Sequence, residues 1–103
     1  MAILTDLEAA GLLNYESADD MPSKVTSVFL PAVDGFIKTA TGKDWGALTE
    51  IYTAVDPVAK MLAGILLVRW FEGTEEVGKA GGIGVIGLVG QLSAKYQQEL
   101  QAV

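Results

Sequence analysis

The segment from Asp56 to Gly73 limits most strongly what this chain can fold into. Asp56 is a typical N-cap, Pro57 suits the first helical position, where no N–H is needed, and Gly73 can adopt the left-handed conformation that ends a helix. Eleven of the fifteen residues between Pro57 and Gly73 are apolar. They go round the helix and do not form one stripe, which is typical of a helix surrounded by protein. We therefore predict a central hydrophobic helix over about residues 57–72.

One side of this helix is a candidate contact surface for another molecule. At about 100° per residue, Lys60, Gly64, Leu67 and Phe71 share that side. Fully burying a large apolar side chain is worth roughly 1.5–3 kcal/mol, and a chain of this length offers only two or three other helices as cover. We therefore expect a second copy or a partner to cover Leu67 and Phe71. The alternative is a monomer whose own helices and loops cover every side.

Composition limits the classes of function. The chain has 103 residues, half of them hydrophobic, which predicts a single domain over residues 1–103. Cysteine is absent, which excludes a disulfide framework and a thiolate metal site. Histidine is absent too, so the usual general base and the commonest metal ligand are missing. We expect no enzyme activity, no cofactor and no metal.

The charge distribution argues against several partners. The net charge is -6, and the first twenty residues carry five acids with no lysine or arginine. A phosphate-backbone binder would instead need a clustered basic face. The start of the chain lacks the positive charge of a signal peptide, and the longest apolar run, Met61 to Val68, is far shorter than the about 20 residues of a membrane span. We expect a soluble protein made in a cytoplasm, with no membrane partner.

Two further helices are predicted before the central one. Thr5 and Glu8 form a capping box that opens a short helix ending at about Leu13, followed by an acidic loop anchored by Tyr15. The expected apolar side of this helix is Leu4, Leu7, Ala10 and Leu13. Residues 21–41 form an amphipathic helix with a kink or break at Pro31, and its expected inward residues are Val25, Val28, Phe29, Ala32, Val33, Phe36, Ile37 and Ala40.

Residues 42–55 are the least regular part of the sequence. Gly42 is a stop signal for the preceding helix, and Trp45 is interpreted as a cover over the core. The run from Leu48 to Thr53 is compatible with a short strand or with a turn of helix, and both alternatives stay open.

A glycine-rich loop, Gly81 to Gly90, is predicted before the last helix. Residues 82–87 match G-x-G-x-x-G, but a dinucleotide site requires a preceding strand and an acid about 20 residues later, and the sequence predicts neither. We interpret the loop as a pliant apolar segment that becomes ordered against a neighbour through Ile83, Val85 and Ile86. The final helix is expected over 88–102, with Leu88, Val89, Leu92, Tyr96 and Leu100 inward.

The remaining charged residues favour structural roles. Glu72, Glu75 and Glu76 with Asp56 are interpreted as a solvated acidic corner and not as a carboxylate pair for acid–base chemistry or a divalent ion. Arg69 is expected to pair with Glu72 or with an acid of the first helix.

Taken in order, these elements resemble the head–tail connector (adaptor) family of tailed phages. The resemblance rests on Leu4-Thr5 with Glu8, on a long second helix ending in Phe36-Ile37 and Thr41-Gly42, and above all on the third helix. There the matching positions are Pro57, Ala59, Leu62, Ile65-Leu66-Leu67, Trp70-Phe71-Glu72 and Glu75. Leu88, Leu92 and Tyr96 match the short terminal helix more loosely.

The resemblance implies an all-α structural protein of the virion neck, made in the host bacterial cytoplasm. Such a subunit forms a ring of about twelve copies under the portal protein, presents a platform to the stopper or tail-completion protein, and lets DNA pass without reading its sequence. It also implies portal contacts from the C-terminal segment, here Gln97, Gln98, Leu100 and Val103. The alternative is a small non-enzymatic helical protein-binding or regulatory module that acts as a monomer or dimer.

Overall fold

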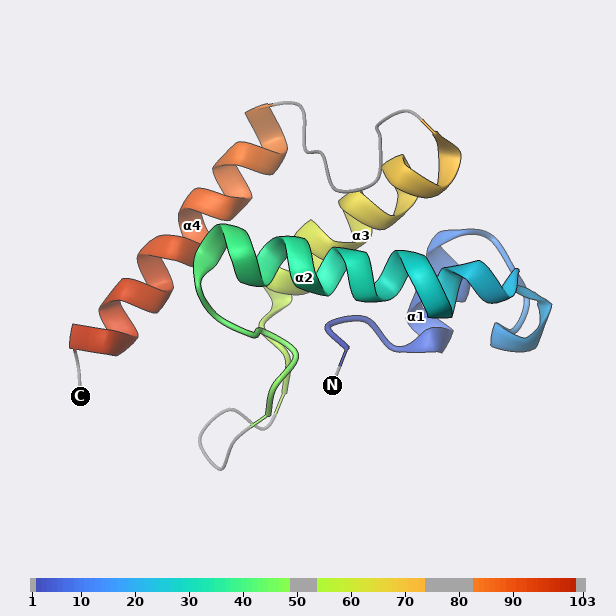
Figure 1. Cartoon of the computed structure of the whole chain (residues 1–103), viewed down its shortest axis with the longest axis horizontal. Helices are drawn as coiled ribbons and strands as arrows, with labels where there is room; N and C mark the ends of the chain where they lie inside the picture. The colour runs from blue at the N-terminus through green and yellow to red at the C-terminus, as the bar shows by residue number, and fades with distance from the viewer. Residues whose placement is uncertain (1, 49–53, 74–82, 102–103) are drawn as a thin grey trace.

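The computed structural model describes residues 2–48, 54–73 and 83–101, and over these ranges the chain is all-α (Figure 1). In chain order its elements are α1 (Asp6–Leu12), the 3-10 helix η1 (Ala18–Asp20), the π-helix η2 (Val25–Phe29), α2 (Leu30–Thr41), α3 (Pro57–Glu72) and α4 (Ile83–Gln101). No strand occurs in the described ranges, and no helix in them has the length and apolar character needed to cross a bilayer. The predicted class, a small helical bundle around a central hydrophobic helix, is confirmed.

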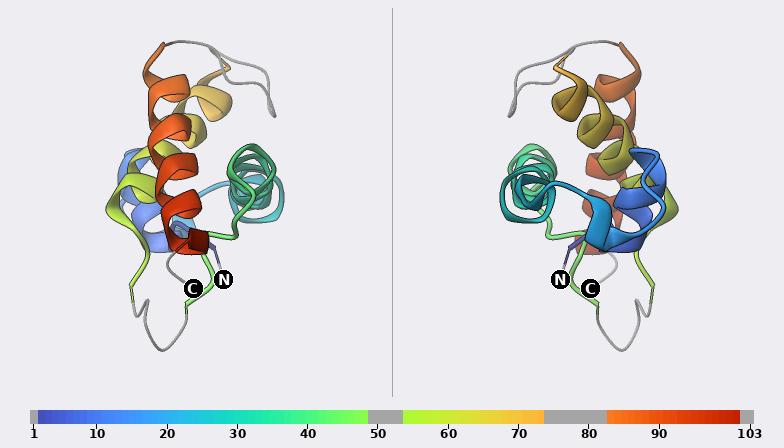
Figure 2. Two further views of the ribbon diagram at one scale, coloured as in Figure 1. Left: turned by 90° about the vertical axis from the view of Figure 1, so that its left-hand side faces the viewer. Right: turned by 90° about the vertical axis from the view of Figure 1, so that its right-hand side faces the viewer.

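The helices are arranged around α3. In Figure 1, α1 and α4 lie at opposite ends of the longest axis, with α2 in front of α3. Figure 2 views α2 nearly end-on and places it to one side of α1, α3 and α4. α3 packs against α1, η2, α2 and α4, so the most hydrophobic helix lies at the centre of the bundle.

Both ends of α3 form as the sequence predicts. The carboxylate of Asp56 accepts a hydrogen bond from the Val58 N–H at 2.8 Å, which caps the helix before Pro57. Gly73 has a φ of 77°, a left-handed conformation that a residue with a Cβ adopts only under strain.

The chain itself covers the side of α3 that was expected to need a second molecule. Leu67 has no exposed surface. The Phe71 ring makes edge contacts with Phe29 and Tyr15, at centroid distances of 5.8 Å and 6.5 Å. The prediction that Leu67 lies at an interface is therefore wrong, because α3 is enclosed there by η2, the loop after α1 and the other helices. Phe71 packs against the core but keeps part of its surface exposed, so its contact role stays a prediction.

The predicted start of α1 is confirmed, and so is its predicted buried side except at Leu7: Leu4 and Ala10 are buried, and Leu13 packs against the core. The Glu8 N–H donates to Thr5 Oγ1 at 3.1 Å, and the Thr5 N–H donates to Glu8 Oε1 at 3.0 Å, so the capping box is present. Ala9 and Ala10 are buried, whereas Leu7 is 70% exposed. The helix turns Ala9 and Ala10 to the core, and Leu7, two residues before Ala9 and so about 200° away from it, lies on the solvent side.

The break at Pro31 takes the form of a π-helix. The Leu30 N–H donates to the Val25 carbonyl, five residues back, and Pro31 is the second residue of α2. A wider turn of this kind leaves room before a proline ring, which would clash with the carbonyl four residues earlier. Val28 lies in the wider turn and is 52% exposed, and Ala40 is exposed as well, so these two predicted inward positions are wrong.

Trp45 is a cover over the core, as predicted. It is 5% exposed, and its Nε1–H donates to Thr41 Oγ1 at 2.8 Å. Gly42 ends α2 with a φ of 87°, and a Cβ at Gly42 would meet the Tyr96 ring at 3.4 Å. The two alternatives for Leu48 to Thr53 fall mostly on residues outside the described ranges.

α4 begins at Ile83, so the prediction of a loop up to Leu88 is wrong for residues 83–87. Val85 is 1% exposed and anchors the start of the helix in the core, which offsets the low helix propensity of the neighbouring glycines. Leu92 is fully buried as predicted, but Leu100, near the end of the helix, is 52% exposed and does not point inward.

Candidate protein-docking groove

An apolar groove lies between the end of α1 and the outer side of α3. One hollow, of about 450 Å³, is lined by Leu12, Lys60, Met61, Gly64, Ile65, Val68 and Arg69. A second hollow, of about 490 Å³, has Leu12, Lys60 and Met61 in common with the first and continues it past Leu4 and Pro57. Because these lining residues are shared, the two hollows form one continuous surface, named here the α1–α3 groove.

Large apolar side chains remain exposed along this groove. Met61 is 58% exposed and Leu12 is 43% exposed, and Ile65 and Val68 are partly exposed beside them. Single exposed apolar residues are common on protein surfaces, whereas a contiguous set along a concave surface marks a site of interaction. Along the α1–α3 groove, the described residues leave apolar side chains of α3 exposed.

Gly64 forms the floor of the groove and sets the distance between the two helices. It is buried although it lies on the outer side of α3. A Cβ at this position would meet Leu12 Cδ1 at 3.3 Å, closer than ordinary van der Waals contact. The glycine therefore lets the end of α1 lie against α3, and it deepens the groove between them.

The lysine at the rim of the groove has its charge balanced within the chain. Lys60 Nζ lies 2.6 Å from Glu8 Oε2, and both side chains are partly exposed. The hydrogen bond from Lys60, together with the one from the Thr5 N–H, holds the pKa of Glu8 below its usual value. Glu8 thus serves both the capping box of α1 and the ion pair with α3. Between Lys60 and Arg69 the groove residues Met61, Gly64, Ile65 and Val68 carry no charge.

The structure places two of the predicted contact residues together and separates the others. Lys60 and Gly64 both line the α1–α3 groove, whereas Leu67 belongs to the monomer core and Phe71 packs against it, as described above. The four residues predicted to share one side of α3 are therefore divided between the groove and the interior of the bundle. The rotation of about 100° per residue shows which residues share one side of α3. It does not show which side the other helices cover.

The predicted contact residues of α4 divide in the same way. Val85 is buried against the core, so its prediction as a surface contact is wrong. Ile86 is 66% exposed, and Gln97, Gln98 and Leu100 are exposed further along the helix. Val103 and the side chain of Ile83 lie outside what the structure describes.

Sequence reasoning missed the large apolar side chains that line the first hollow of the groove: Leu12, Met61, Ile65 and Val68. Since α3 is apolar on every side, its periodicity gives no signal for the uncovered side. Leu12 was placed near the end of the first helix without a role. The exposed Leu12 and Met61 become recognisable only once the position of α1 on α3 is known.

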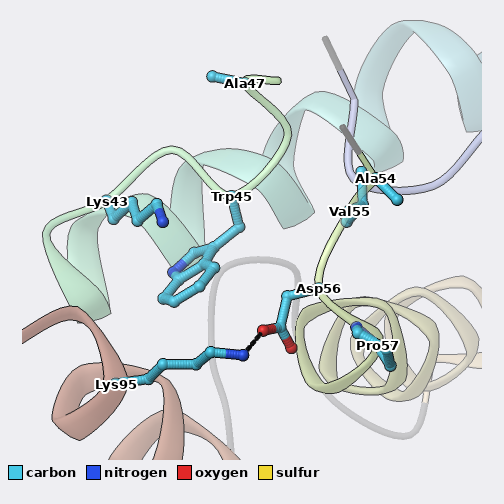
Figure 3. Close-up of a pocket in the computed structure, with 8 residues that line it drawn as sticks. All are labelled: Lys43, Trp45, Ala47, Ala54, Val55, Asp56, Pro57 and Lys95. Atoms are coloured by element: carbon cyan, nitrogen blue, oxygen red, sulfur yellow. Dashed lines mark hydrogen bonds and ion pairs between the residues drawn. The ribbon is translucent and has the colours of Figure 1, made fainter. Parts of the chain in front are cut away.

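A smaller hollow of about 270 Å³ lies where the loop after α2 meets α3 and α4 (Figure 3). Lys95 of α4 pairs with Asp56, the residue that caps α3. Lys43 pairs with Glu99 at 2.7 Å and lies 4.3 Å from the centre of the Trp45 ring. Burial opposes ionisation of Asp56, but the hydrogen bonds from Lys95 and the Val58 N–H hold its pKa below the usual value. The two ion pairs at this hollow therefore connect α4 to the cap of α3 and to the loop after α2.

The other motifs of the sequence do not assemble a chemical site in the described residues. Gly84 and Gly87 lie within α4 and not in a loop between a strand and a helix, so the glycine pattern lacks the geometry of a dinucleotide site. In the part of the chain that the structure covers, no group of three or more acidic, histidine or cysteine residues is arranged to hold a metal ion. Glu75 and Glu76 of the predicted acidic corner lie outside that part.

Comparison of the chain with known protein families, with curated proteins and with solved structures finds no match. Its function is therefore argued from the groove, the charges and the resemblance given by the sequence.

Proposed function

We propose that the chain is a non-enzymatic structural subunit of the head–tail connector (adaptor) kind. It forms a ring beneath the portal of a tailed phage, receives the stopper or tail-completion protein, and lets DNA pass. The observation that carries this proposal is the α1–α3 groove, an uncovered apolar surface on a helix whose other sides are packed. The all-α fold around α3 and the sequence resemblance support it.

The chemistry of the groove favours a protein as its occupant. Sites for small molecules combine apolar walls with a few placed polar groups that fix the orientation of the ligand. Between Lys60 and Arg69 the groove offers only the apolar Met61, Gly64, Ile65 and Val68. A neighbouring subunit with an apolar face would remove these side chains from water, which is the main favourable term in protein association.

The charge of the chain supports the passage of DNA and not its retention. With a net charge of -6, and with five acids and no lysine or arginine in the first twenty residues, the subunit would not hold a polyanion in a channel. A ring of such subunits would carry many negative charges, so DNA would pass through it without binding.

The proposal is tested by association of the purified chain with itself and with the portal protein encoded by the same phage genome. Met61→Asp places a charge in the groove, and Val28→Asp is the matched control, because Val28 is about as exposed on η2. We expect Met61→Asp to lose at least tenfold in association, measured by sedimentation velocity and portal co-purification, while Val28→Asp keeps it. A wild-type chain that binds neither itself nor the portal would refute the proposal.

A second candidate is supported by the completeness of the monomer core. Leu67 and Trp70 are buried by the chain itself, so these two large side chains of α3 need no partner to cover them. A small helical binding module acting as a monomer or dimer would have the same property. A mass that stays at one or two chains across a concentration series, with and without portal protein, would favour this candidate.

A further inference from the structure

We infer that the occupant of the α1–α3 groove is the exposed face of the N-terminal half of α4 from a second copy of the chain. This inference rests on the proposed function, and it specifies which two surfaces meet when subunits associate.

The outward face of α4 is free of charge over its N-terminal half. Ile86 is 66% exposed there, and its exposed neighbours on the helix are Gly84, Gly87, Gly90, Gln91 and Ala94. Among the side chains that the structure describes on this face, Ile86 is the one large apolar group, and its neighbours are small or neutral. A helix with this face presents a narrow apolar ridge to solvent.

The glycines of this face have no role in the described fold of the monomer. A Cβ at Gly84, Gly87 or Gly90 would meet nothing within 4 Å, and none of the three has a positive φ. Glycine is also among the least favourable residues in a helix interior. A role remains if another backbone approaches this face closely, since an absent side chain lets two helices come together.

The groove and this face match in charge and in shape. The groove has uncharged residues between Lys60 and Arg69, and the charge of Lys60 is balanced by Glu8. An uncharged ridge loses no ion hydration on entering the stretch between Lys60 and Arg69, whereas a charged side chain placed on that stretch would be desolvated against Met61, Ile65 and Val68. The concave site over Gly64 would receive the Ile86 side chain, and the glycines beside Ile86 would let the helix lie close to Met61 and Leu12.

The two surfaces belong to different parts of the subunit. α1, which forms one wall of the groove, and α4 lie at opposite ends of the longest axis in Figure 1, and the two views of Figure 2 agree with this placement. A contact between two different surfaces is heterologous and repeats from copy to copy. It closes into a ring when the rotation allows, without any surface pairing with itself.

Cross-linking between two single-cysteine variants tests this pairing, because the chain has no cysteine of its own. Met61→Cys and Ile86→Cys are purified separately, mixed at a concentration at which the wild type associates, and oxidised mildly. The control mixture replaces Met61→Cys by Val28→Cys, which introduces a thiol at a similarly exposed position. We expect the mixed Met61–Ile86 disulfide to form at least fivefold faster than the control disulfide and than either disulfide between identical variants.

Each alternative result has a definite meaning. Dominant Met61–Met61 disulfides would overturn the inference in favour of a groove-to-groove contact while leaving self-association intact. Subunits that assemble, alone or on the portal, without the mixed disulfide would overturn the inference and leave the proposed function standing. Absence of any association would overturn both.

A second variant tests the close approach separately from thiol chemistry. Gly87→Leu adds a bulky side chain where the monomer has open space, so the melting temperature should not fall. We expect association to weaken at least tenfold. Unchanged association of Gly87→Leu would overturn the inference.

Discussion

Replacing glycines within α4 by alanine should make the subunit more stable. Gly87 and Gly90 lie inside the helix, their φ values are not positive, and a Cβ at either would meet nothing within 4 Å. Alanine is favoured over glycine in a helix interior by roughly 0.5–1 kcal/mol. The double variant Gly87→Ala/Gly90→Ala should therefore raise the free energy of unfolding by about 1–2 kcal/mol, or the melting temperature by about 5–10 °C.

Urea denaturation followed by circular dichroism measures this change. Gly73→Ala is the matched control, since Gly73 has a φ of 77°, and the same substitution there should cost about 1 kcal/mol. The opposite signs follow from backbone conformation alone. A double variant that is less stable than the wild type would refute the reasoning, because it would mean that residues 83–90 are not helical or that their glycine positions are crowded.

Three further predictions concern the core, the groove and the ion pairs. Leu67→Ala should lower the free energy of unfolding by about 2–5 kcal/mol, because Leu67 is fully buried, whereas Met61→Ala should change it by no more than about 0.5 kcal/mol; equal effects in urea titrations would contradict the assignment of Leu67 to the core. Gly64→Ala should leave the fold intact, since the flexible end of Leu12 can shift from its 3.3 Å approach, but should alter the groove and weaken association in sedimentation. The pKa values of Glu8 and Asp56 are lowered in the folded chain from 4.5 and 3.8, so their stabilising contributions are complete above those values and are lost as the pH falls through the folded pKa values. Burial raises the pKa of Asp34, so ionisation of Asp34 lowers the stability of the folded chain as the pH rises. Unfolding titrations between pH 2 and 6 should accordingly show a shallower acid loss for the double variant Glu8→Gln/Asp56→Asn, and an unchanged slope would contradict the role of the two ion pairs.

The features of the fold that could be predicted from the sequence are those with local causes. The capping box of Thr5 and Glu8, the N-cap Asp56 and the left-handed Gly42 and Gly73 each depend on residues a few positions apart, and all are present. Trp45 as a cover over the core was also predicted correctly.

The features that could not be predicted depend on how helices pack. Because α3 has apolar residues on every side, its sequence gives no signal of which side remains uncovered, so Leu67 was predicted as a contact and Met61 was not. Leu7 was predicted to face inward from its spacing, but α1 turns Ala9 and Ala10 to the core, which places Leu7 on the solvent side of the helix. The low helix propensity of the glycines before Leu88 led to the prediction of a loop. The structure has a helix there instead, and the buried Val85 stabilises it.

The two tryptophans lie in different parts of the bundle. Trp70 packs edge-on against Phe36 between α2 and α3, with ring centroids 5.7 Å apart, whereas Trp45 lies beside Lys95 of α4 (Figure 3). Their intrinsic fluorescence therefore reports two separate events. Emission from a variant that keeps only Trp45 should follow the detachment of α4, and emission from one that keeps only Trp70 should follow the opening of the bundle, so partial unfolding becomes visible without any added label.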